Sequence, residues 1–328
     1  MLRALALVAC MILPGHAMAD CAGTDLIAAL PPETAAALDR AALLAPYAQG
    51  NLWRATRGTL TVHLVGTYHL DDPRHAATLA RIDPLIAEAA TLLVEAGPAE
   101  EAALAERVAR EPGIMLITDG ATLPELLSAP DWQALSQAMR DRGIPPFMAA
   151  KFRPWYLSML LGIPACDMDR ISARGGLDGL IIEAAVARGV PVKALEPYDT
   201  LFGLFEGMSQ ADQLTMVQTA LAMEPAAADM SITLAEAYFA ENSRHLWEFL
   251  RLQTLALPGA DPDAVTRDFA MMEDALMIRR NRAWIAVIEA EAARGPLLVA
   301  FGALHLSGEQ GVLALLEAQG FTLQRLAF

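Results

Sequence analysis

Short runs of apolar residues, each closed by a turn or a polar residue, alternate along this chain with longer segments of helical pattern. Runs of this length, rich in Leu and Val, predict buried β-strands. They lie at 52–56, 59–65, 91–94, 190–195, 297–301 and 321–326. Because Arg57-Gly58 stands between the first two runs, we expect these to form an antiparallel hairpin.

Segments with apolar residues three or four positions apart predict the helices between the strands. They lie at 31–44, 73–90, 177–188, 262–293 and 309–319, the fourth expected as one long helix. Two further stretches, at about 100–165 and 199–260, have a helical pattern that Pro and Gly interrupt. The length would allow two small domains. The order of elements predicts a single α/β domain over 20–328, with a mixed, largely parallel central sheet flanked by helices and two helical insertions.

Two of the predicted strands end in the same motif, Gly-x-x-His-Leu. The first copy is Gly66-Thr67-Tyr68-His69 and the second is Gly302-Ala303-Leu304-His305. Glycine lets the backbone turn sharply at the end of a strand, so each imidazole is expected beyond the carboxyl edge of the sheet, where open α/β sheets bind ligands. A single histidine of this kind would more often cap a loop or lie in the core. The repetition predicts that His69 and His305 share one site.

Carboxylates follow two other strands. Glu95 comes directly after 91–94, and Glu196 directly after 190–195. A right-handed β-α-β crossover should place the strand ends that carry His69 and Glu95 side by side. The alternative for each glutamate is a surface position or a contact with a helix N-terminus.

These groups have the chemistry of a metal site. Two imidazoles and a carboxylate form a mixed nitrogen and oxygen donor set that suits zinc, manganese or cobalt. We therefore expect His69, His305 and Glu95 to hold a divalent transition metal, with metal-assisted hydrolysis as the reaction. Glu95 and Glu196 would share the ligand and general-base roles.

Two polar residues on the predicted helix 262–293 are further candidates for catalysis. Arg280 and Asn281 precede the strand that carries the second motif. They would polarise a substrate carbonyl or fix a carboxylate. The other histidines are expected to have structural or solvent roles; they are His16, His63, His75 and His245.

The beginning of the chain and its cysteines indicate export. Residues 1–19 have the pattern of a secretory signal, with Ala17-Met18-Ala19 as the cleavage site. The mature chain would keep Cys21 and Cys166, which predict one disulfide in an oxidising compartment. No later apolar run is long enough to span a membrane, and a net charge of −15 argues against nucleic acid as a partner. We expect a periplasmic or secreted protein.

The chain resembles the TraB/GumN family, within the superfamily that also contains the Tiki, erythromycin-esterase-like and ChaN-like proteins. The resemblance spans most of the mature chain, and its most specific mark is the paired Gly-x-x-His. The other matching segments are Leu52-Trp53-Arg54, Val94-Glu95, Pro154-Trp155, Gly176-Leu177-Asp178, Leu195-Glu196, Arg280-Asn281, and Gly308 with Gly311.

This resemblance implies an α/β core with helical insertions. By analogy with the Tiki branch it implies a divalent-metal-dependent peptidase that uses His69, His305 and Glu95 on a peptide or protein substrate. Glu196 and Asp178 are further family positions. One departure is Arg279, because the family usually has Glu before Arg-Asn; an ion pair between that acid and Arg280 would be missing here.

Two other functions remain open from the sequence. The same site could bind haem or a peptide without turnover, with Tyr68 as a candidate axial ligand and the Met-rich segment 208–230 lining the groove. The name GumN also suggests a non-catalytic scaffold in the export of envelope polysaccharide.

Overall fold

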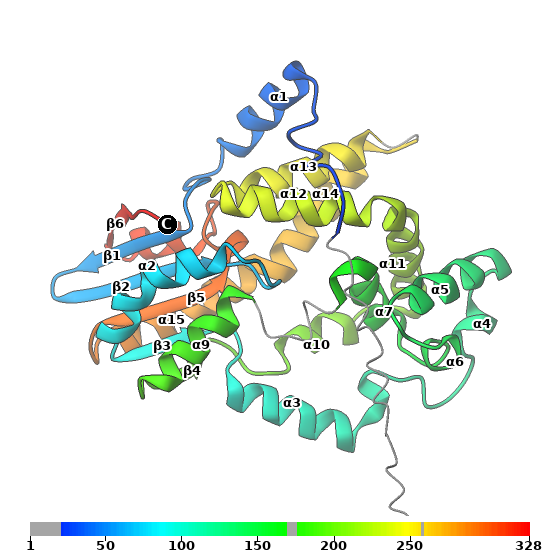
Figure 1. The fold of residues 1–328 in the computed structure, drawn as a ribbon, viewed down its shortest axis with the longest axis horizontal. Coiled ribbons are helices and arrows are strands. Elements are labelled where there is room, and N and C mark those ends of the chain that lie inside the picture. The colour runs from blue at the N-terminus through cyan, green and yellow to red at the C-terminus, as the bar shows by residue number, and fades with distance from the viewer. Residues whose placement is uncertain (1–20, 169–175, 257–258) are drawn as a thin grey trace, which may run out of the picture.

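A computed structural model describes residues 21–168, 176–256 and 259–328. A six-stranded sheet, in the order β4-β3-β5-β2-β1-β6, forms the centre of one half of the molecule (Figure 1). Its strands are β1 Leu52–Arg57, β2 Leu60–Thr67, β3 Thr91–Val94, β4 Val192–Ala194, β5 Leu297–Gly302 and β6 Thr322–Arg325. β2, β3, β4 and β5 are parallel, whereas β1 pairs antiparallel with both β2 and β6. The predicted mixed, largely parallel sheet and its first hairpin are confirmed.

The order of the central strands differs from the expectation in one respect. β5 pairs with β2 on one side and with β3 on the other, so the ends of β2 and β3 are not neighbours. The expectation that a simple crossover places these ends side by side was wrong, because the strand that carries the second motif inserts between them. His69 and Glu95 therefore approach each other across the end of β5.

Helices cover both faces of the sheet. On one face α2 (His75–Glu88) and α9 (Leu177–Ala187) bury residues such as Ile82 and Ile181 against Val65 and Leu298. On the other face α15 (Arg279–Ala292) and α16 (Val312–Ala318) bury Trp284 and Leu316 against Leu64 and Val299. Alternate residues of one strand serve opposite faces, so this sheet has two apolar cores.

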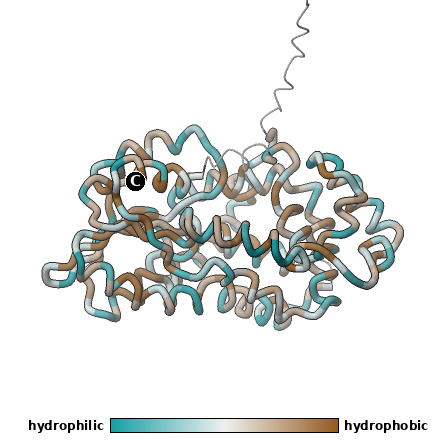
Figure 2. Tube along the Cα trace, turned by 90° about the horizontal axis from the view of Figure 1, so that it is seen from below, coloured by the Kyte–Doolittle hydropathy of each residue, from teal (hydrophilic) through white to brown (hydrophobic). Residues whose placement is uncertain are grey.

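The insertion segments form the second half of the molecule, to the right of the sheet in Figure 1. The first contains α3 Pro98–Arg110, α4 Leu123–Leu126, α5 Ala129–Asp141, α6 Pro146–Ala149 and α7 Pro154–Leu161. The second contains α10 Thr200–Glu206, α11 Gln210–Met223, α12 Ala227–Phe239 and α13 Ser243–Leu255. α4, α5, α7 and α11 share an apolar core of their own, with Leu135, Leu157 and Val217. Figure 2 shows hydrophobic segments in both halves.

The N-terminal part of the described chain is held against the helical half. Cys21 and Cys166 form a disulfide with Cα atoms 5.3 Å apart, which confirms the predicted pairing. The segment then contacts α12, where Thr24 and Leu26 donate their backbone N–H to Asp229 and Thr233, and it leads to α1 (Pro32–Ala42). The predicted signal at 1–19 lies outside the described residues.

The expected helix at 262–293 is interrupted. α14 (Pro262–Glu273) is followed by a π-helical turn at Asp274–Ile278 and then by α15. The extra residue in a π turn shifts the positions that follow relative to the apolar pattern, and such turns are frequent at functional sites. Here the turn directly precedes Arg280 and Asn281. In the described part of the chain, no helix is long and apolar enough to cross a bilayer.

Candidate functional site

Four of the predicted site residues, His69, Glu95, Glu196 and Arg280, line a cavity of about 270 Å³ at the carboxyl ends of β2, β3 and β5, whereas His305 and Asn281 do not line it. Its walls come from these strand ends, from α9, from the loop after β4 and from α15. The lining residues include Thr67, His69, Glu95, Glu101, Asp178, Ile182, Glu196, Tyr198 and Arg280. The two Gly-x-x-His segments meet beside this cavity, because Gly302 of the second motif lies next to His69 of the first.

Gly302 lies where three of the candidate ligands come together. A Cβ atom at Gly302 would lie 3.3 Å from His69 Nε2, 3.4 Å from Glu95 Oε1 and 3.8 Å from His305 Cδ2. His305 Nε2 is itself 4.0 Å from Glu95 Oε1. The missing side chain of this glycine leaves a small space, which we call the Gly302 cradle, with two imidazoles and a carboxylate around it.

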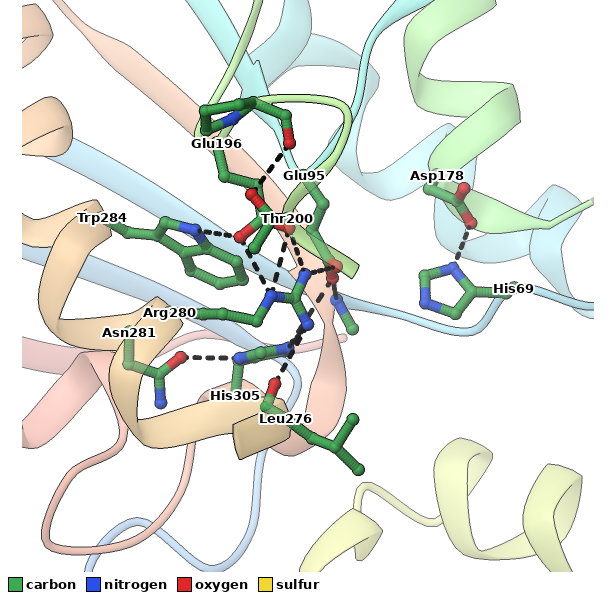
Figure 3. Close-up of polar contacts among 12 residues, drawn as sticks. His69, Glu95, Asp178, Glu196, Thr200, Leu276, Arg280, Asn281, Trp284 and His305 are labelled. Atoms are coloured by element: carbon green, nitrogen blue, oxygen red, sulfur yellow. Dashed lines mark hydrogen bonds and ion pairs between the residues drawn. The ribbon is translucent and has the colours of Figure 1, made fainter. Parts of the chain in front are cut away.

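His69 is held from behind by a carboxylate. Its Nδ1 lies 3.1 Å from Asp178 Oδ1. Figure 3 shows this contact, and Nε2 is the nitrogen that faces the cradle. Desolvation by the pocket acts to lower the pKa of His69, but the hydrogen bond and charge of Asp178 outweigh it and raise this pKa to about 9. The side chain is 61% exposed, so water screens part of this charge interaction. Asp178 favours the protonated ring.

The position of Asp178 depends on a close backbone approach. Leu177, the first residue of α9, donates its N–H to the carbonyl of Tyr68 at 3.0 Å. A Cβ on Gly176 would clash with the carbonyl of His69. Glycine at this position therefore allows the N-terminus of α9 to reach the first motif.

His305 has the opposite environment. It is buried, and its Nδ1 lies 2.6 Å from Asn281 Oδ1, an acceptor, so Nδ1 carries the proton and Nε2 is the acceptor. Arg280 Nη1 donates to this Nε2 at 3.2 Å. Burial, together with the charges of Arg280 and His69, lowers the pKa of His305 to about 4 despite the nearby Glu95. The ring is therefore neutral at physiological pH.

Glu95 remains ionised in this setting. Burial acts to raise the pKa of Glu95, but the charges of Arg280 and of the protonated His69, together with the N–H of Gly302, hold this pKa below its usual range. Oε1 accepts the Gly302 N–H at 2.6 Å, and Oε2 accepts from Arg280 Nη2 at 2.5 Å. The carboxylate thus presents a fixed negative oxygen beside the cradle.

Arg280 lies at the centre of the polar network in Figure 3. Its Nε and Nη2 donate to Glu196, its Nη2 also to Glu95, and its Nη1 to the carbonyl of Leu276 and to His305. Every N–H group of this guanidinium therefore has a partner within the protein. Arg280 does fix carboxylates, but they are those of the protein itself, and a contact with a substrate carbonyl would require one of these bonds to break.

The other two predicted catalytic residues are similarly engaged. Glu196 accepts from Arg280 through both oxygens and also from Trp284 Nε1 at 3.0 Å. Asn281 is 2% exposed, and its Nδ2 donates to the carbonyl of Gln310 at 2.8 Å. Their contacts position Arg280 and His305, and the catalytic roles expected for them stay predictions.

Arg279 does not disturb the network. Its side chain is 72% exposed and pairs with Asp274 in the π turn. Arg280 obtains its acidic partners from the ends of β3 and β4 instead, so the ion pair that seemed to be missing is supplied by other elements.

Two groups of the polar network were not predicted from the sequence. Trp284 lies four residues after Arg280, on the same side of α15, and this spacing could have indicated it. The backbone N–H of Gly302 leaves no sequence signal. The remaining histidines have other surroundings: His63 is half-buried in β2, His75 contacts the carbonyl of Leu70, and His245 pairs with Asp39.

The structure gives little support to haem at this site. Tyr68 is 8% exposed and stacks on Tyr238 with ring centroids 5.4 Å apart, outside the lining of the cavity. Of the methionines in 208–230, Met208 lines a separate cavity of about 600 Å³ in the helical half. The residues described as lining that cavity include neither His nor Tyr.

The donor set fits a divalent metal in three respects. His69 Nε2 and Glu95 Oε1 lie around the Gly302 cradle, next to His305. Each imidazole is bonded through Nδ1 to an oxygen acceptor, the arrangement by which proteins orient metal-binding histidines. Thr67 Oγ1, from a lining residue, is buried and has no hydrogen-bond partner among the described residues. As the side chains lie, no group of three His, Cys, Asp or Glu residues in the described part of the chain is placed to hold a metal ion. Arg280 contacts both His305 and Glu95.

Fold and site together define an α/β protein with a His-Glu-Arg pocket at the ends of its parallel strands. The sequence profile of the TraB/PrgY/gumN family matches residues 51–325. The chain belongs to this family, and the matched segment includes every residue of the site.

Comparison with curated proteins gives relatives of similar length. The chain is 25% identical over 279 residues to "Uncharacterized protein YbaP" of Escherichia coli (strain K12), which covers 80% of this chain and 96% of that protein. The protein of the same name from Shigella flexneri matches to the same extent. No solved structure matches the chain.

Proposed function

We propose that this protein is a metal-dependent hydrolase of the cell envelope, with peptides or proteins as its substrates. The observation that carries the proposal is the convergence of His69 Nε2, Glu95 Oε1 and His305 on the Gly302 cradle. Two imidazoles with an ionised carboxylate beside a cavity are a donor set for zinc, manganese or cobalt. Export follows from the signal pattern at 1–19 and agrees with the disulfide.

His69, His305 and Glu95 would hold the ion. A divalent ion at this position supplies a Lewis acid for a carbonyl group and acidifies water. The chain's own residues arrange the rest. Asp178 and Asn281 fix the two rings, and Arg280 keeps Glu95 ionised and in place.

Hydrolysis then needs an oxygen nucleophile and a proton acceptor. Water attacks the carbonyl carbon, a C–O bond forms, and the C–N bond breaks. The proton from water passes to a carboxylate and then to the leaving amine. Glu95 Oε1 lies beside the cradle and, among the described residues, accepts only a backbone N–H, that of Gly302, whereas both oxygens of Glu196 accept from the charged side chain of Arg280. We therefore assign the proton transfer to Glu95 and the fixing of Arg280 to Glu196.

The test is hydrolysis of a peptide library by the purified protein with manganese, cobalt or zinc, and after chelation. Activity should appear with metal, be lost on chelation, and be lost in His69→Ala and in His305→Ala. His63→Ala is the matched control, because His63 lies on the same strand as the first motif and outside the cavity lining. Equal activity in all three variants would overturn the proposal.

A further inference from the structure

A second cavity lies in the helical half and is separate from the cavity around His69. It measures about 600 Å³, within the range of sites that bind small ligands. Three aromatic rings contribute to its wall: Trp155 stacks on Phe205 with centroids 4.8 Å apart, and Phe202 meets the same indole edge-on at 5.6 Å. Ile114, Ile117 and Met208 add apolar surface. This wall suits a large apolar side chain, and an aromatic one best.

Polar groups at the same cavity are free for a peptide backbone. Gln213 is 8% exposed and donates its amide N–H to the carbonyls of Phe205 and Met208. Its Oε1 has no partner in the described structure. Arg153 donates its Nε–H to the carbonyl of Gly113 at 2.5 Å. Its terminal nitrogens have no protein acceptor among the described residues. An acceptor and a cationic donor thus stand beside the aromatic wall.

The cavity is connected to the site by two segments that begin at the catalytic strand ends. α3 starts shortly after Glu95 and leads to Glu111 and Ile114 in the cavity wall, and α10 starts shortly after Glu196 and carries Phe202 and Phe205. Arg107 of α3 binds Asp199, the residue before α10, at 3.1 Å. Both cavities therefore border the same pair of connections.

The shorter of the two connections is the one through α10, since α3 has 13 residues. α10 has 7 residues, and a helix of this length spans roughly 10 Å. An extended chain advances about 3.3 Å per residue, so about three residues cover this distance. We propose that the aromatic cavity is a specificity subsite, which binds a large apolar, preferably aromatic, side chain about three residues from the bond that is cleaved. This proposal rests on the proposed hydrolase function.

The experiment uses acetylated and amidated Ala/Ser heptapeptides in which one Phe occupies each position in turn. Mass spectrometry gives the cleaved bond, and initial rates give KM and kcat for each peptide. Phe about three residues from the cleaved bond should lower KM roughly tenfold relative to the peptide without Phe, with kcat little changed. The same KM for every Phe position would overturn the proposal.

Two variants connect the preference to this cavity. Met208→Trp fills the space, and Phe205→Ala removes the ring that stacks on Trp155, so both should abolish the preference for Phe. Phe147→Ala is the control, because Phe147 is 75% exposed in the same half and does not line the cavity. A preference that survives Met208→Trp would contradict the assignment, even if Phe205→Ala fails to fold.

Failure of the hydrolase function can be recognised separately. If the wild type cleaves none of the peptides, the proposed function fails, and calorimetry with the same peptides then tests the subsite alone. Tighter binding of a Phe peptide in the wild type, lost in Met208→Trp and kept in Phe147→Ala, would support the subsite. Equal binding of the peptides with and without Phe would overturn it.

Discussion

The two Gly-x-x-His segments have the same residue pattern but use it differently. In the first motif, the glycine makes room for packing: a Cβ on Gly66 would lie 2.7 Å from Leu306 Cδ1 and 2.9 Å from Ala303 Cα. In the second, the glycine makes room for the site, because the corresponding Cβ on Gly302 would lie among the candidate ligands.

The sheet register explains this difference. In the parallel pair of β2 and β5, Gly66 is opposite Phe301 and Thr67 is opposite Gly302. The second motif is therefore offset by one residue, and because successive residues of a strand face opposite sides of the sheet, the two glycines face opposite ways. A repeated motif need not be a repeated environment.

The histidines differ in the same way. His69 is exposed, is paired with a carboxylate and has a raised pKa, whereas His305 is buried, is paired with an amide, contacts a guanidinium and has a lowered pKa. The surroundings of His69 favour the protonated ring, and those of His305 favour the neutral ring. The second motif is therefore part of a buried network, whereas the histidine of the first is largely exposed to solvent.

The largest effect should come from removing the centre of that network. Arg280→Met leaves the carboxylates of Glu95 and Glu196 without their cation, and should lower the free energy of unfolding by about 3–5 kcal/mol. The matched control is the neighbouring Arg279→Met, where the side chain is 72% exposed and the change should stay within about 0.5 kcal/mol. Urea denaturation measures both. Equal losses of unfolding free energy in the two variants would show that Arg280 does not stabilise the buried network.

The next prediction separates the two glycines. Gly66→Ala should destabilise the protein by about 1–3 kcal/mol, because its methyl group enters a packed contact. Gly302→Ala should change stability by less than about 1 kcal/mol, since its neighbours are side-chain ends, but should weaken metal binding at least about tenfold. Denaturation and metal titration of both variants provide the comparison, and a reversed order of the stability losses would contradict it.

A smaller effect should distinguish the groups behind the two rings. Asn281→Ala leaves a buried His305 N–H and the carbonyl of Gln310 unpaired and should cost about 1–3 kcal/mol. Asp178→Ala, at a side chain that is 35% exposed, should cost about 0.5 kcal/mol or less. Both should lower metal affinity about tenfold. If Asp178→Ala leaves metal affinity unchanged, His69 is not oriented as the structure indicates.

Much of this architecture could be predicted from local sequence signals. The apolar runs and Arg57-Gly58 gave the hairpin, and the residues that follow the strands gave His69, Glu95, Glu196 and His305. These signals work because strand ends and turns depend on neighbouring residues. The disulfide could be predicted by counting, because the mature chain keeps only two cysteines.

What could not be predicted depends on contacts between distant segments. The insertion of β5 between β2 and β3 is a choice of strand pairing that no local pattern contains. No signal in the apolar pattern of 262–293 marked the π turn before Arg280. The use of every N–H of Arg280 within the protein follows only from the folded arrangement. A sequence can thus indicate which residues meet, while their division of roles requires the structure.

If the proposed function is correct, the two motifs hold one metal ion at the Gly302 cradle. An anomalous difference map from a crystal of the protein soaked in zinc tests it most directly. The account predicts a peak about 2.0–2.1 Å from a ring nitrogen of both His69 and His305. A zinc-soaked crystal with no peak between these two side chains, and with Arg280 still bonded to His305, would contradict it.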